Sequence, residues 1–210
     1  MDTLIGKVPG DWTDVRLAQV CEVLAGPSGA SINQGARRSL DVPVVMPRDF
    51  RNNQIVEDNL AMITLEAAAG LSRYRLIPGD VVCARNGELG RQALVGHEQG
   101  GWLFGTACLR LRVGASISPR YLIYYLGHPA VRDWIMRNAT GSAIRTLSTK
   151  TLGSMPVVLP PGAVQSAIGE VLSALDEKVA VHDQISRTAA ALRDSLISLL
   201  VAGSSRINQA

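Results

Sequence analysis

The C-terminal part of the chain carries a long helical pattern, and this pattern constrains the fold more than any other feature. Between residues 163 and 202 there is no proline, and Gly169 is the only glycine. Apolar side chains recur there at alternating spacings of four and three residues, which is a heptad pattern. At a rise of ~1.5 Å per residue the predicted helix is roughly 58 Å long. Pro160 and Pro161 stand before it, and Gly203 is placed to end it.

A helix of this length cannot bury its whole apolar stripe against a domain of ~160 residues. Its far half therefore needs another helix, from a second copy of the chain or from a different subunit. Lys178 and His182 interrupt the stripe near its middle. They can fix the register and number of the partner helices, or mark a hinge or a contact with the chain's own domain. The predicted partner-facing residues are Ile168, Val171, Leu175, Ile185, Leu192 and Leu196.

The first 160 residues have a different character, with short apolar runs separated by turn residues. Strands are predicted at residues 41–46, 80–84, 91–95, 107–113 and 155–159. In the fourth run Leu109 and Leu111 alternate with Arg110 and Arg112, so the arginines share one face of the strand.

Two helices are predicted between the last two strands. They cover residues 119–126 and about 129–138, and each begins with a proline, which suits the first turn of a helix. The predicted fold is therefore a mixed α/β domain, an α+β arrangement with a mostly β centre, at residues 1–160. A long dimerisation and docking helix follows at 161–203, with coiled-coil-like contacts, and a tail at 204–210.

Composition and charge narrow the class of protein. Hydrophobic residues make up 47% and charged residues 19% of the chain, which allows a proper core and argues against disorder. Of 21 basic residues 18 are arginine, whose forked guanidinium suits phosphates and guanine edges, although a GC-rich genome produces the same bias. Residues 1–160 carry a net charge of +4 and residues 161–210 a net charge of −1. Nucleic acid, if bound, is therefore expected on the first part.

Sequence patterns for catalysis, metal binding and membrane insertion are missing. Cys21, Cys83 and Cys108 are far apart and form no metal-binding or disulfide pattern, so buried free thiols are expected. His97 beside Glu98 could form an acid–base pair, but a solvated loop is the simpler interpretation. Phosphate-loop, dinucleotide and nucleophile motifs are not found either. With no signal peptide and no run of ~18 apolar residues, we expect a cytoplasmic protein that is not an enzyme.

Polar loops offer contact chemistry instead. Residues 85–91 place Arg and Asn on a loop with two glycines, and such side chains can form paired hydrogen bonds to guanine and adenine edges. Residues 140–150 combine hydroxyl groups with two cations, a composition suited to phosphates. Residues 37–38 and 48–54 are further polar segments that could extend the contact surface. The candidate DNA-contacting residues are Arg85, Asn86, Arg91, Ser142, Arg145, Thr146, Ser148, Thr149, Lys150, Arg48 and Asn52.

Several segments resemble the DNA specificity subunits of type I restriction-modification systems. Residues 76–87 (LIPGDVVCARNG) are similar to the L-x-x-GD-[IV]-[LV]-x-x-R-x-G segment of that family. Residues 155–161 (MPVVLPP), followed by Gln165, Ile168 and Leu172, are similar to its closing segment, which is the most specific part. The opening residues 12–17 (WTDVRL) fit as well, and the resemblance covers about residues 10–202.

This resemblance implies a target recognition domain that reads double-stranded DNA, followed by a helix that docks on a methyltransferase (modification) subunit. That subunit and a restriction subunit would then act at the target site. Typical members hold two such domains and two helices, whereas a single copy is found here. Either two copies pair as a homodimer, or the chain is one half of a split or truncated subunit, or it serves a single-chain methyltransferase. The resemblance also implies that S-adenosylmethionine and ATP bind only to partner subunits.

Two alternatives remain open from the residues alone. One is a coiled-coil interaction protein whose globular domain binds protein, and salt-dependent binding to duplex DNA would separate it from a DNA reader. The other is a small enzyme with a site around His97 and Glu98.

Overall fold

The computed structural model describes residues 1–27 and 41–201. The chain divides into two units, Met1–Leu172 and Ser173–Ala210. The polar pair at 37–38, the helix end at Gly203 and the tail at 204–210 lie outside the described residues. No helix among the described residues is long and apolar enough to cross a membrane.

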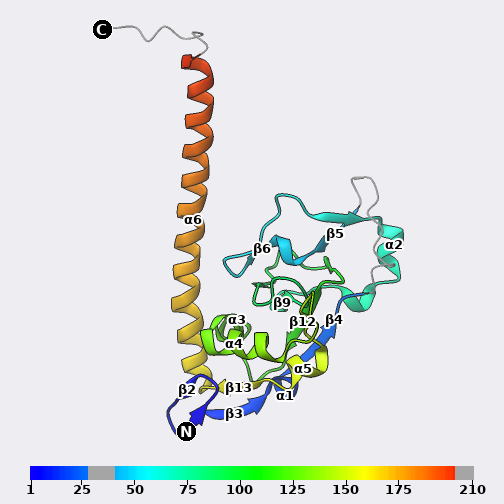
Figure 1. Ribbon diagram of the computed structural model, residues 1–210, viewed down its shortest axis with the longest axis vertical. Coiled ribbons are helices and arrows are strands. Elements are labelled where there is room, and N and C mark those ends of the chain that lie inside the picture. Colours follow the sequence, from blue (N-terminus) through cyan, green and yellow to red (C-terminus); the bar gives the residue numbers. More distant parts are fainter. Residues whose placement is uncertain (28–40, 202–210) are drawn as a thin grey trace. The chain divides into compact units, whose positions relative to one another are not determined.

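A four-stranded antiparallel sheet forms the centre of the first unit (Figure 1). Its order is β10 (Gln92–Leu94), β9 (Val81–Ala84), β12 (Cys108–Val113) and β4 (Cys21–Ala25). Every residue of β9 is buried, because both faces of the sheet are covered. Successive side chains of a strand point to opposite faces, and two hydrophobic clusters accordingly lie one on each side of this sheet. A third cluster is formed by residues within 42–44 and 61–71 and by Leu103.

The larger cluster lies between the sheet and a layer of helices. This layer comprises α3 (Pro119–Gly127), α4 (Pro129–Asn138) and α5 (Thr149–Gly153). Ser118 and His128 accept backbone hydrogen bonds at the starts of α3 and α4, directly before the prolines. The hydroxyls of Tyr121 and Tyr125 donate to the carbonyls of Val158 and Pro156, which joins α3 to the strand β13 (Pro156–Leu159).

The N-terminal segment completes this side of the unit. β1 (Asp2–Thr3) and β2 (Gly6–Lys7) form a small hairpin, and β3 (Thr13–Arg16) pairs antiparallel with β13. The short helix α1 (Leu17–Val20) then leads into β4, and its Leu17 is fully buried.

The other side of the sheet carries a second, three-stranded sheet. Its order is β11 (Leu103–Phe104), β5 (Val42–Val45) and β8 (Ala61–Ile63), and β11 is parallel to β5. The connections hold the helix α2 (Leu65–Ala69) and the short 3-10 turns η2 (Pro47–Asp49) and η3 (Ser72–Tyr74).

A tight hairpin projects from this second side. Its strands are β6 (Phe50–Arg51) and β7 (Gln54–Ile55). The two residues between them, Asn52 (φ 49°) and Asn53 (φ 61°), both have positive φ, as a type I′ turn requires and as asparagine tolerates.

The C-terminal helix α6 (Gly162–Val201) has 40 residues. Its first turns belong to the first unit, where the buried Gln165 side chain bonds Ser118 N (2.8 Å), Ser116 O (3.2 Å) and Pro160 O (2.9 Å). Gly169 lies so close to Arg120 that an added Cβ would be 2.8 Å from that residue's Cβ. In the second unit the helix exposes apolar side chains along its length, namely Leu175, Val179, Val181, Ile185, Leu192, Leu196, Ile197, Leu199, Leu200 and Val201.

The predicted mixed α/β fold with a long C-terminal helix is confirmed, and all five predicted strands and both predicted helices are present with ends shifted by a residue or two. Arg110 and Arg112 do share a face of β12, but that face is covered as well, so Arg110 is only 2% exposed. The strands β1, β2, β3, β4, β6, β7, β8 and β11 and the helices α1, α2 and α5 were not predicted. Most of them are shorter than the pattern needed to recognise them, but β4, with five residues, is a strand of the central sheet that was missed.

Candidate nucleic-acid interface

The two polar loops singled out in the sequence lie against each other, although some fifty residues separate them along the chain. Asn86 forms an isolated antiparallel bridge with Thr146. The amide of Leu147 donates to the carbonyl of Arg85 at 2.7 Å, and the amide of Arg85 donates to Ala107 at 2.7 Å. The fold thus brings the predicted contact residues of both loops into one surface, which we call the paired loops (residues 85–91 and 140–147).

The first of the paired loops connects β9 to β10. Gly87 (φ 74°) and Gly90 (φ 94°) adopt left-handed backbone conformations that L side chains rarely take. Arg91 forms an ion pair with Glu88 inside the loop and is 41% exposed. The Nε of Arg85 is buried and has no hydrogen-bond partner among the described residues. The loop therefore presents Asn86 and Arg91 at the surface edge, with Arg85 at the junction with the second loop.

The second of the paired loops is closed on itself by its own backbone. Thr140 N donates to Thr146 O at 3.0 Å, and Thr146 N donates to Thr140 O at 2.7 Å. Gly141 has φ 105°, and an added Cβ would be 2.4 Å from the carbonyl oxygen of Ile144. The guanidinium of Arg145 donates to the carbonyl of Met136 at the end of α4. Arg145, a predicted DNA contact, is therefore exposed, and its guanidinium also holds its own loop against α4.

Ser148 and α5 continue the chain from this loop to a groove. Ser148 accepts from Thr151 N at 2.9 Å, so its hydroxyl caps α5. α5 contacts α1 and β4, and a groove between these elements is lined by Arg16, Ala18, Cys21, Val23, Thr149, Lys150, Gly153 and Ser154. Arg16 donates to Ser154 O at 3.2 Å across it. The lining contains two cations, Arg16 and Lys150, and no carboxylate. Arg16 was not among the predicted contact residues, because it ends the short strand β3 and is far from Lys150 in the sequence.

Of the three remaining predicted residues, Ser142 is exposed in the second of the paired loops, and Arg48 and Asn52 lie at or near the Asn52–Asn53 turn. Leu94 N donates to Asn53 O at 2.9 Å, and Gln92 Nε2 lies 3.4 Å from Asn53 Oδ1, so this turn borders β10 and the strand end that follows Arg91. Arg48 lies on η2, where its guanidinium is 3.7 Å from Asp49. Asn52 is thus close to the first of the paired loops through β10, and Arg48 sits on the neighbouring 3-10 turn.

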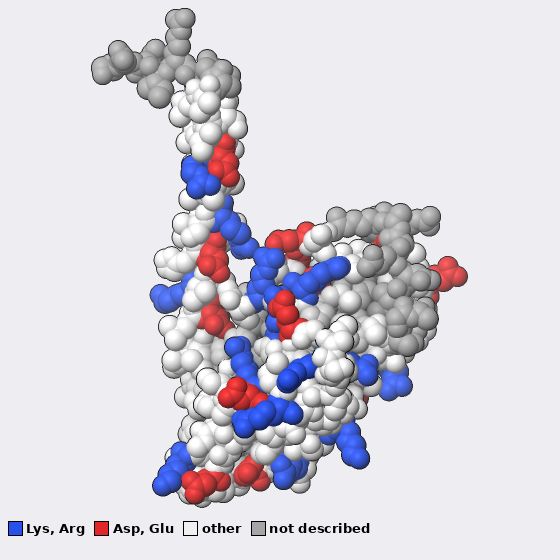
Figure 2. Space-filling view, in the orientation of Figure 1, with Lys and Arg blue, Asp and Glu red and all other residues white. Residues whose placement is uncertain are grey.

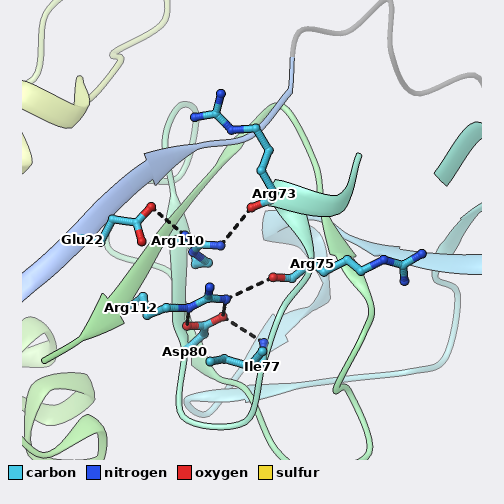
Figure 3. A network of polar contacts seen from close by, with 7 residues as sticks. All are labelled: Glu22, Arg73, Arg75, Ile77, Asp80, Arg110 and Arg112. Carbon is cyan, nitrogen blue, oxygen red and sulfur yellow. Dashed lines mark hydrogen bonds and ion pairs between the residues drawn. The ribbon is translucent and has the colours of Figure 1, made fainter. Parts of the chain in front are cut away.

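A network of ion pairs lies on the central sheet toward the start of β9, whereas the first of the paired loops follows the end of β9 (Figure 3). Arg112 bonds both carboxylate oxygens of Asp80 at 2.8 Å, and Asp80 also accepts from Ile77 N. Arg110 bonds Glu22 at 2.9 Å and Arg73 O at 3.0 Å. Burial lowers the pKa of Arg110, whereas the bond to Asp80 raises the pKa of Arg112. Asp80 thereby holds the turn before β9 against β12.

The three cysteines are buried free thiols. Burial raises the pKa of Cys21 and of Cys83 to about 12, and that of Cys108 well above its ordinary value. His97 and Glu98 are exposed in the loop after β10. Among the residues that the structure describes, no group of three or more His, Cys, Asp or Glu side chains could hold a metal ion.

Charged side chains are interspersed over the first unit in Figure 2, where blue Lys and Arg alternate with red Asp and Glu. The face drawn therefore has no single broad basic patch. Binding to a polyanion would depend on individually placed cations, such as those of the groove, more than on a uniform field.

Comparisons with known proteins agree with the resemblance seen in the sequence. A protein of Methanocaldococcus jannaschii, assigned as the specificity subunit of the type I restriction enzyme MjaX, is 26% identical over 184 residues. The match covers 84% of this chain, and the chain spans 42% of the length of that relative.

Solved structures share the fold. The HsdS subunit from Thermoanaerobacter tengcongensis matches with a TM-score of 0.56 at 20% identity, over 86% of this chain and 41% of that one. The type I restriction-modification S subunit from M. genitalium matches with a TM-score of 0.63 at 14% identity, over 93% and 48% of the two chains. The family model described as type I restriction modification DNA specificity domain matches residues 9–189. The chain therefore belongs to the type I restriction-modification DNA specificity domain family.

Proposed function

We propose that the first unit reads one part of a double-stranded DNA target and that the chain directs partner subunits to it. The observation that carries this proposal is the pairing of two polar loops, distant in sequence, into one surface through the Asn86–Thr146 bridge. Membership of the DNA specificity domain family supports it. The chain would act in the cytoplasm, where cellular DNA is accessible to such a complex.

The side chains of this surface divide into two roles. Asn86, Arg85 and Arg91 would read base edges in the major groove, where Asn pairs with adenine and Arg with guanine. Lys150 and Arg16, together with the hydroxyl of Thr149, would contact phosphates at the groove beside α5 and set the position of the domain on the duplex. Ser148 and Arg145 would act indirectly, by holding α5 and the second loop in place.

Catalysis would belong to the partners. The chain would bind neither S-adenosylmethionine nor ATP, and the modification subunit, with a restriction subunit where one exists, would supply both reactions. The long helix α6 is the proposed docking element. Val171, Leu175, Ile185, Leu192 and Leu196 are between 44% and 62% exposed along it, while Ile168 packs on the core of its own unit.

A second copy, or a separate second half, would complete the reader. The chain spans less than half of the relatives it matches, and a specificity protein of their length would contain two segments of this size. Two copies paired through α6 would present two target recognition domains and would select a bipartite DNA site.

Selection from a random duplex library tests the DNA-reading role. The full chain, alone and with its modification subunit, is used to enrich sequences, and fluorescence anisotropy compares the enriched duplex with a shuffled duplex of the same composition. We expect tighter binding to the enriched duplex, with a strong salt dependence. Equal affinity for both duplexes would contradict sequence reading. Light scattering of the chain with and without the modification subunit tests the assembly.

A further inference from the structure

The tip of the second paired loop presents a large apolar side chain to the surface. Ile144 is 64% exposed, and within the described residues of the first unit no other large hydrophobic side chain is exposed to that extent. Its neighbours in the loop are Ser142, Ala143 and Arg145. Isolated exposed apolar residues are common, so exposure alone does not indicate a role. The exposure of Ile144 is relevant because this residue lies on the paired loops, the surface proposed to read DNA.

The loop that carries Ile144 is held in one shape before any ligand arrives. The two Thr140–Thr146 hydrogen bonds close it, the left-handed Gly141 turns it, and its end is joined to Arg85 through Leu147 N. The Arg145 guanidinium fastens it to the end of α4. A side chain on such a loop loses little conformational freedom on binding, so its contacts contribute more of their free energy to affinity.

The groups on the edges of the bases indicate what the Ile144 side chain would contact. In the major groove the base edges present hydrogen-bond donors and acceptors, and the C5-methyl group of thymine is the apolar group that a side chain can contact. Asn86, bridged to Thr146 in the adjoining strand segment, is a side chain suited to adenine. We infer that Ile144 is a specificity-determining residue that contacts the methyl group of a thymine in the target, which favours an A·T pair at that position. This inference rests on the proposed function.

A thymine lacking its methyl group tests the contact directly. The probe is the enriched duplex in which each thymine is replaced in turn by deoxyuridine, which removes the methyl group and keeps the hydrogen-bonding pattern. Loss of one buried methyl group corresponds to about fourfold weaker binding. We expect this loss at one position for the natural chain, and no loss at that position for Ile144→Ser. Ile144→Val should keep most of it.

Controls separate this inference from the proposed function. Leu65→Ser removes a 56% exposed apolar side chain on α2, which is not part of the paired loops, and should leave the deoxyuridine effect unchanged. An enriched site without thymine, or equal deoxyuridine sensitivity of the natural chain and Ile144→Ser, would overturn the inference while leaving DNA reading intact. Weaker capture of the modification subunit by Ile144→Ser, with no deoxyuridine effect, would instead assign Ile144 to a protein contact. Failure to enrich any sequence would refute the proposed function itself.

Discussion

Replacing Arg16 and Lys150 by alanine should change the salt dependence of DNA binding by a calculable amount. Both side chains line the groove between α1, β4 and α5, and no carboxylate lines it. Each phosphate contact that a cation makes to duplex DNA contributes about −0.9 to the slope of log K against log [salt]. If each residue neutralises one phosphate, each single variant should flatten the slope by about 0.9, and the double variant by about 1.8.

Anisotropy titrations between about 50 and 200 mM salt measure this slope. The enriched and the shuffled duplex should lose affinity to the same extent, because phosphates are shared by all sequences. Arg16→Lys and Lys150→Arg keep the charge and should keep the slope. Arg187→Ala, an exposed arginine of the second unit, is the matched control. An unchanged slope in the double variant, or a loss restricted to the enriched duplex, would refute the phosphate assignment.

Other predictions concern the frame around the interface. Gln165→Ala removes three hydrogen bonds of a 4% exposed side chain and should lower the free energy of unfolding by about 3 kcal/mol, measured by urea denaturation; a loss below about 1 kcal/mol would show that the start of α6 is held by other contacts. Gly141→Ala introduces strain of about 2 kcal/mol at φ 105° and should weaken DNA binding more than it lowers stability; unaltered affinity would argue against a role for the loop. Burial raises the pKa of Cys21 and Cys83 from 9.0 to about 12, so these thiols should resist alkylation at pH 8 until the chain unfolds. Their contribution to stability is fully present below pH 9 and is lost as pH rises toward 12, so the unfolding free energy should fall over that window, and a flat profile would contradict it. Leu192→Asp places a charge in the exposed stripe of α6 and should reduce the mass measured by light scattering if two copies pair there; an unchanged mass would exclude pairing through this stretch.

Periodic patterns made much of the fold predictable. Alternation in β12, the prolines that begin α3 and α4, and the heptads of α6 are local signals, and each led to an element at its predicted place. The burial of Arg110 was not predictable in this way. Alternation shows that two faces differ, but only the second sheet, which covers the polar face, decides that the arginine is buried over Phe104 beside Glu22.

The candidate site was predictable in composition and not in arrangement. The loops around Asn86 and Arg145 were recognised from their polar and glycine residues, but their pairing depends on backbone contacts between distant segments, which no local pattern encodes. The polar character of a residue also does not show whether its side chain is free to contact a ligand or holds its own loop in place, as Arg145 does. Ile144 was not among the predicted contacts, because an apolar residue in a loop is ordinarily expected to pack against the core.

The second paired loop is held mainly by main-chain hydrogen bonds, so its side chains can change during evolution while its shape is kept. The hydrogen bonds of Thr140, Thr146 and Leu147 use amides and carbonyls that any residue other than proline at a donor position can supply. Gly141 is the one position whose geometry demands a particular residue. Residues 142–144 are therefore open to drift by point substitution without loss of the loop's shape. New target preferences can arise inside one domain, in small steps, without exchange of the whole domain for another.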